Sequence, residues 1–99
     1  MPRLAFLVFI AFVAAGPAQA SIACVVRPSA GEATTLRLAP FSLAPALARL
    51  ERGRQVRDEG IEIRGWRLVE AWPPARACCA DASETRWGWA QVADLDDCG

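Results

Sequence analysis

The chain has 99 residues, with 11 arginines, 11 acidic residues, no lysine and no histidine, so its formal net charge is zero. This balance lacks the basic surplus with which proteins bind DNA, RNA or anionic lipid, and we expect no nucleic-acid partner. The absence of histidine excludes Ser-His-Asp and Cys-His catalytic arrangements, and the absence of lysine excludes a Ser-Lys pair or a Schiff base.

Residues 1–20 have the three parts of a secretory signal peptide. Arg3 gives a positive start, residues 4–15 (LAFLVFIAFVAA) form an apolar run, and residues 18–20 (AQA) form a small-residue cleavage site. The run is shorter than the roughly 20 residues that span a bilayer, so a cleaved signal is favoured over a membrane anchor. We therefore expect an exported protein, periplasmic or extracellular, with residues 21–99 as one mature domain and no membrane span after cleavage.

The four cysteines all lie in the mature part. An even number in a short exported chain predicts two disulfides. Adjacent Cα atoms lie about 3.8 Å apart, closer than in most disulfides, so a bond between two neighbouring cysteines is the least expected pairing. The other two pairings tie the cysteines near the chain ends to the central pair. The cysteines are Cys24, Cys78, Cys79 and Cys98.

Two other interpretations of the cysteines are weaker. The chain has no histidine and no zinc-knuckle spacing, so we expect no metal site. Residues 21–24 (SIAC) faintly resemble a lipobox, which makes lipidation of Cys24 an alternative to its pairing in a disulfide. Lipidation would leave an odd number of cysteines, and the motif does not directly follow the apolar run.

The first half of the mature chain predicts short strands and one long loop. Residues 24–27 and 34–38 have strand character and are separated by a loop that contains glycine. Residues 39–45, with two prolines and no periodicity, predict a long ordered loop. Residues 46–51 have the propensity to begin a helix, although Gly53 follows almost at once.

The next segments alternate more clearly. Residues 55–58 and 61–63 predict strands, and Glu59 and Gly60 between them are typical of a turn or bulge. Residues 65–72 (GWRLVEAW) form the strongest predicted strand in the chain.

The rest of the chain predicts one more strand. Pro73 and Pro74 are expected to end the preceding strand, and residues 75–85 to form a polar loop that carries the cysteine pair. Residues 86–92 predict a last strand, and residues 93–95 a single helical turn. Several short strands without a long helical period indicate a small all-β barrel or sandwich.

Four sequence elements follow one another along the mature chain: a first strand and loop at residues 36–40, an L-x-x-G-x-x-V element at 50–56, a G-W-x-x-V element at 65–69, and a closing strand and turn at 88–95. Their order resembles that of bacterial SH3-like domains. The resemblance implies a small, partly open SH3-like barrel of about five strands, in a mostly non-catalytic module of cell-envelope proteins. It implies structural roles for Leu36, Gly53, Val56, Trp66, Val69, Gly88, Trp89 and Leu95.

The four tryptophans are the best candidates for contact with a ligand. We expect Trp66 and Trp89 to pack in or beside the core, whereas Trp87, at a strand start, and Trp72, beside two prolines, are more plausible as exposed platforms. Tryptophan stacks on sugar rings, proline and peptide, and it is enriched in binding hot spots. The candidate ligand-binding residues are Trp72, Trp87, Phe41 and Arg37.

The expected function is a non-catalytic binding module of the cell envelope that recognises a peptide, peptidoglycan or a protein partner, without a cofactor. An alternative is a small secreted inhibitor or protein-interaction factor that acts through the disulfide-pinned loop of residues 73–85. A third and much weaker hypothesis is a hydrolase with paired carboxylates, at residues 58–59 or 94–97. No catalytic residues are assigned.

The intact mass of the exported protein tests these expectations. We expect a chain that begins at Ser21, carries no lipid, and lacks the four hydrogens that two disulfides remove. Electrospray mass spectrometry before and after reduction measures all three features. Free thiols together with a mainly helical circular dichroism spectrum would contradict the predicted disulfide-bonded β domain.

Overall fold

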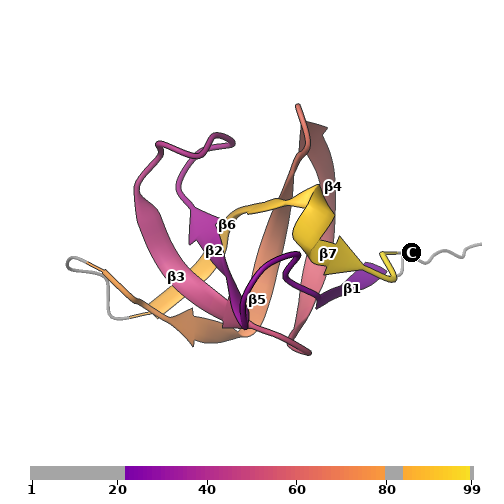
Figure 1. The fold of residues 1–99 in the computed structure, drawn as a ribbon, viewed down its shortest axis with the longest axis horizontal. Coiled ribbons are helices and arrows are strands. Elements are labelled where there is room, and N and C mark those ends of the chain that lie inside the picture. Colours follow the sequence, from indigo (N-terminus) through magenta and orange to yellow (C-terminus); the bar gives the residue numbers. More distant parts are fainter. Residues whose placement is uncertain (1–21, 80–83, 99) are drawn as a thin grey trace, which may run out of the picture.

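The computed structural model describes residues 22–79 and 84–98, and in these residues the domain is all-β, as the sequence predicts. A single antiparallel sheet has the strand order β3-β2-β6-β5-β4-β1-β7 (Figure 1). Its strands are β1 (Ile22–Val26), β2 (Ala33–Arg37), β3 (Ala46–Glu51), β4 (Gln55–Ile63), β5 (Trp66–Arg76), β6 (Glu84–Gln91) and β7 (Leu95–Asp96). The predicted single helical turn is the 3-10 turn η2 (Val92–Asp94). The predicted signal peptide lies outside the described residues.

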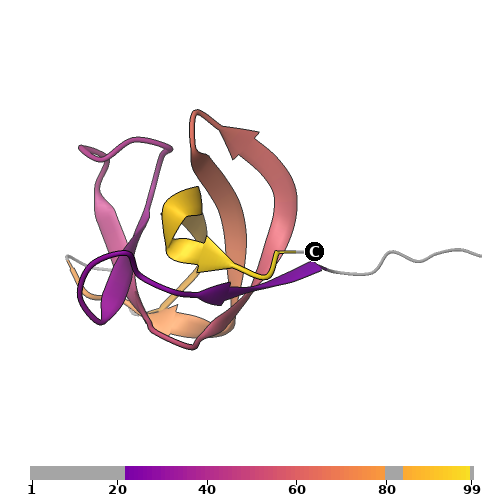
Figure 2. The same cartoon turned by 45° about the vertical axis from the view of Figure 1, so that its right-hand side comes forward.

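The sheet is curled but is not closed into a barrel. It has seven strands where about five were expected, and β3 and β7 form its two ends. The curl brings the end of β5 back to β3, where Ala48 and Ala77 form an isolated bridge and the Cys78 N–H donates to the Leu47 carbonyl at 3.3 Å. Strands β2 and β3 lie on one side of the fold and the hairpin of β4 and the first part of β5 on the other, and Figure 2 shows η2 (yellow) between them.

Residues 46–51 form strand β3 rather than the start of a helix. Ala48 and Leu50 are buried, whereas Arg49 and Glu51 are exposed, which is the period of a strand with one face on the core. Pairing with β2 sets Leu50 opposite Thr34. A helix this short is unfavourable to nucleate, so the pairing outweighs the helical propensity of the segment.

Strand β5 continues through Pro73 and Pro74, contrary to the sequence-based expectation. Between the pairs Glu70–Trp87 and Ala75–Thr85, four positions of β5 (residues 71–74) face one position of β6 (Arg86). The prolines lie in this bulge, where their missing N–H groups remove no hydrogen bond from the ladder.

The bulge expected at Glu59 and Gly60 is confirmed. The register of β4 against β5 shifts between Asp58 and Glu62, and Gly60 has a φ of 83°, a conformation that favours glycine.

The two disulfides join Cys24 to Cys98 and Cys78 to Cys79, so the pairing that was least expected is the one present. Cys24 is fully buried in β1, and β1 pairs with β7, which brings the following Cys98 within reach. Cys78 and Cys79 lie in an exposed segment after β5. Because Cys24 and Cys98 are bonded to each other, the two neighbouring cysteines pair together. The distance between adjacent Cα atoms did not prevent the bond.

A hydrogen-bond network around Asp94 ties η2 to β2 and to the loop that precedes β2. The buried Asp94 carboxylate accepts hydrogen bonds from the backbone and hydroxyl of Ser29, both at 2.8 Å, and from the Thr34 hydroxyl at 2.6 Å. Burial opposes ionisation of this carboxyl, but the donated hydrogen bonds outweigh it and lower the pKa of Asp94 below its ordinary value. The ionised carboxylate therefore ties β2 and the preceding loop to η2.

Gly88 allows β2 and β6 to approach closely. A β-carbon at this position would overlap Leu36 Cγ and lie 3.1 Å from the Arg37 carbonyl oxygen. Leu36 is fully buried in the core, so it has little room to move. Close packing of β2 against β6 therefore requires a residue without a side chain at position 88.

We expect Gly88→Ala to lower the free energy of unfolding by about 1–3 kcal/mol, because the added methyl group overpacks the contact with Leu36. In Gly88→Ala/Leu36→Ala the methyl group has room, so the double variant should lose less stability than the sum of the single variants. Urea unfolding measures all three, with Gln91→Ala, at an exposed position of β6, as the control. Additive losses would contradict the proposed contact.

Candidate functional site

All four tryptophans lie on the outer face of the β5–β6 hairpin or at its end. Val69 and Ala90, which are fully buried, point to the core. Side chains alternate along a strand, so the paired residues Leu68 and Trp89, and likewise Glu70 and Trp87, lie on the opposite face. Alternation also places Trp66 and Trp72 on that face, because Arg67 faces Ala90 and Ala71 is buried. Trp66 and Trp89 were expected in or beside the core. They are half-buried on the face of the hairpin that points away from the core.

The most exposed tryptophans, Trp72 and Trp87, share one arginine. The Arg86 guanidinium carbon lies 4.6 Å from the Trp72 ring centroid and 5.6 Å from that of Trp87. Both distances are within the range of cation–π attraction. Trp72 is 64% exposed and Trp87 is 51% exposed, so each ring keeps much of its surface open to solvent. We call Trp72, Arg86 and Trp87 the tryptophan platform.

A buried carboxylate holds the platform's arginine. Glu70 is only 8% exposed, and its Oε2 lies 4.0 Å from Arg86 Nε. Its other oxygen, Oε1, lies 3.3 Å from Arg57 Nη1, and Arg57 is directly opposite Glu70 on β4. One carboxylate therefore attracts guanidinium groups from β4 and β6, the two strands that flank β5, and this attraction favours a position of Arg86 beside the two indoles.

A shallow hollow adjoins the platform. It has a volume of about 200 Å³ and is lined by Ala23, Gln55, Val56, Arg57 and Trp72. Pockets for drug-sized ligands measure roughly 300 Å³ or more, so this hollow is sized for a single side chain or a similar small group. We call it the Trp72 hollow.

The structure places the other two candidate residues elsewhere. Arg37 lies opposite Trp89 at the end of β2, and its Nη1 donates to the Ala44 carbonyl at 3.0 Å, so it shapes the loop of residues 38–45. Phe41 is 53% exposed in that loop. The structure thus joins Trp72 and Trp87 through Arg86, and it engages Arg37 within the domain.

Sequence reasoning missed Glu70 and Arg57, which support the site. The one signal was a charged pattern: Glu70 alternates with Trp72 along a strand, and Arg57 lies at an outward position of β4. Only the register of three strands brings these side chains together.

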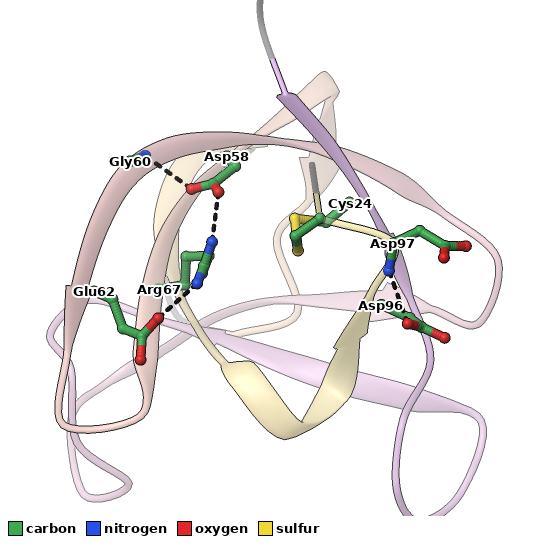
Figure 3. The surroundings of a disulfide bond; sticks show 8 residues. Cys24, Asp58, Gly60, Glu62, Arg67, Asp96 and Asp97 are labelled. Atoms are coloured by element: carbon green, nitrogen blue, oxygen red, sulfur yellow. Dashed lines mark hydrogen bonds and ion pairs between the residues drawn. A yellow bond between two sulfur atoms is a disulfide. The ribbon is translucent and has the colours of Figure 1, made fainter.

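Of the carboxylates considered for hydrolysis, Asp58, Asp96 and Asp97 have partners within the domain (Figure 3). Asp58 accepts from the Gly60 N–H at 2.8 Å and from Arg67 at 2.6 Å, and Arg67 also bonds Glu62 at 2.5 Å. These hydrogen bonds raise the pKa of Arg67 above its ordinary value. Beyond the disulfide of Cys24, Asp96 and Asp97 form ion pairs with Arg27 at 3.3 and 3.6 Å.

Comparison with known protein families, curated proteins and solved structures finds no match to this chain. Within residues 22–79 and 84–98, no helix is long and apolar enough to cross a membrane. The same part of the chain contains no group of three or more potential metal ligands. The tryptophan platform is therefore characterised by its own geometry.

We expect Arg86→Met to make Trp72 and Trp87 more accessible to acrylamide, because the guanidinium that holds them is lost. The loss of stability should be small, about 0.5–1 kcal/mol, as for other exposed cation–π contacts. Stern–Volmer quenching of tryptophan fluorescence measures the first effect and urea unfolding the second. Arg64→Met, in the turn between β4 and β5, is the matched control; equal quenching in both variants would contradict the contact.

Proposed function

We propose that this protein is a non-catalytic binding module of the cell envelope that recognises a peptide, peptidoglycan or protein partner through the tryptophan platform. The observation that carries the proposal is the pair of exposed indoles, Trp72 and Trp87, oriented by one arginine and one buried carboxylate. Two disulfides are compatible with an oxidising compartment outside the cytoplasm, where we propose that the protein acts.

The platform suits a partner with flat apolar surfaces. Indole rings stack on sugar rings, proline and peptide bonds, and they lose little conformational entropy on binding because each has only two side-chain torsions. Glu70 and Arg86 hold the rings before a ligand arrives, which reduces the ordering cost of association. The adjoining Trp72 hollow would take one projecting group of the same partner.

We further propose that the fold is related to the bacterial SH3-like domains. Two glycines that match the pattern of these domains occupy positions that favour glycine in this fold. Gly53 has a φ of 90°, and Gly88 lies against Leu36 with no space for a side chain. The closing strand β6 is followed by a helical turn and then by Leu95, as the resemblance implies. Because the sheet is not closed into a barrel, the proposed relation rests on the order of the elements along the chain.

The engagement of the carboxylates supports a binding role rather than hydrolysis. A retaining or inverting glycosidase needs two carboxyl groups that face the same bond of the substrate. Asp58 and Glu62 instead share the Arg67 guanidinium, and Asp94 accepts three hydrogen bonds from Ser29 and Thr34. Each of these groups therefore has a partner within the domain.

Sedimentation with purified peptidoglycan tests the proposed function. We expect the mature, oxidised protein to be retained in the pellet, and Trp72→Ala and Trp87→Ala each to reduce the bound fraction about tenfold, because indole anchors dominate such interfaces. Leu43→Ala is the matched control, since Leu43 is 91% exposed but lies in the loop of residues 38–45. Circular dichroism and urea midpoints establish that the variants are folded.

Two results would overturn parts of the proposal. Equal retention of the tryptophan variants and the wild type would exclude the platform as the binding surface. If the wild type is not retained, peptidoglycan is excluded, and cross-linking of the exported protein in its own envelope becomes the test for a protein partner.

A further inference from the structure

A second hollow lies where the β3–β4 turn meets the end of β5. Its volume is about 470 Å³, more than twice that of the Trp72 hollow. Four of its six lining residues are arginines, and one is acidic. The lining residues are Arg49, Glu51, Arg52, Gly53, Arg54 and Arg76, and we call this hollow the arginine pocket.

This concentration of positive charge stands out in a chain with no net charge. Elsewhere in the domain arginines are commonly paired with carboxylates, as Arg67 is with Asp58. In the pocket, by contrast, Arg49, Arg54 and Arg76 form no ion pair with any residue of 22–79 or 84–98. Such pairs within 4.0 Å in that part of the chain involve only Arg27, Arg52, Arg57, Arg67 and Arg86.

The nearby acidic groups do not neutralise the pocket. Glu32 lies 3.7 Å from Arg52 Nε, and Glu84 is opposite Arg76 in the register of β5 and β6 without forming an ion pair. Among the described residues that line the pocket, Glu51 is the one carboxylate. The wall therefore keeps an excess of positive charge, which is unfavourable unless an anion is bound.

Backbone carbonyls hold two of the arginines in place. Arg52 Nη2 donates to the Gly31 carbonyl at 2.9 Å and to the Pro28 carbonyl at 3.3 Å. Arg54 Nη2 donates to the Pro73 carbonyl. These hydrogen bonds use one nitrogen of each guanidinium, and Arg52 Nε faces Glu32, so Nη1 of Arg52 and both Nε and Nη1 of Arg54 are left for a ligand. Part of the ordering cost of binding is therefore met before the ligand arrives.

We propose that the arginine pocket is a binding site for a phosphate-type oxyanion with at least two negative charges. Guanidinium groups match such oxygens through paired, charge-assisted hydrogen bonds, which makes arginine the preferred residue for phosphate recognition. The volume exceeds that of a single phosphate group, so the hollow has room for a second phosphate or an attached organic group. The site does not depend on the tryptophan platform.

Titration of the oxidised mature protein with sodium pyrophosphate, at constant ionic strength, tests the site. We expect saturable shifts in the ¹H–¹⁵N spectrum at residues 49–54 and 76, and Arg76→Gln should weaken binding about tenfold. Arg64→Gln removes the same charge outside the pocket and should bind like the wild type. Trp87→Ala should also bind like the wild type, which separates this site from the platform.

The outcomes distinguish a specific anion-binding site from non-specific electrostatic attraction. Equal weakening in Arg76→Gln and Arg64→Gln, shifts that do not saturate, or shifts away from the pocket would each overturn the proposal. Sedimentation with phosphatidylglycerol vesicles, compared with phosphatidylcholine vesicles, then identifies the source of the phosphate: Arg76-dependent pelleting indicates a lipid headgroup, and its absence together with pyrophosphate binding indicates a soluble or glycan-borne phosphate.

Discussion

The constraint on which this structure depends is the small size of its core side chains. Five of the eleven buried hydrophobic residues in the described part of the chain are alanines, and the largest fully buried ones are leucines and valines. Such a core removes little apolar area from water, so other interactions have to stabilise the sheet. The close approach of Gly88 to Leu36, the ionised network of Asp94 and the disulfide of Cys24 serve this purpose, the last contributing roughly 4 kcal/mol for a loop of this length.

The small core also determines where the aromatic residues lie. A sheet packed closely over alanine has no space for indole rings on its inner face, and the four tryptophans lie on the outer face instead. Two of them are half-buried there, and the other two form the tryptophan platform with Arg86. The surface that we propose for recognition is thus a consequence of how the inner face is packed.

The sequence predicted features that depend on neighbouring residues. Alternation identified the strands around Trp66 and Trp89, Gly60 indicated a bulge, and Trp72 and Trp87 were expected to be exposed. Features that depend on distant residues were missed: β3 became a strand by pairing with β2, and Cys24 met Cys98 because β1 pairs with β7. Both proposed binding surfaces likewise need side chains from at least two strands, which no local pattern reveals.

The bond between Cys24 and Cys98 also has a mechanical consequence. It joins positions 74 residues apart whose Cα atoms are 4.3 Å from each other, so the intervening chain forms a covalent ring and its two ends leave from one point (Figure 3). Tension applied through those ends passes along the sulfur–sulfur bridge and by-passes strands β2 to β6. A stretching force of this kind would therefore leave the surfaces on those strands undeformed while the bridge is oxidised.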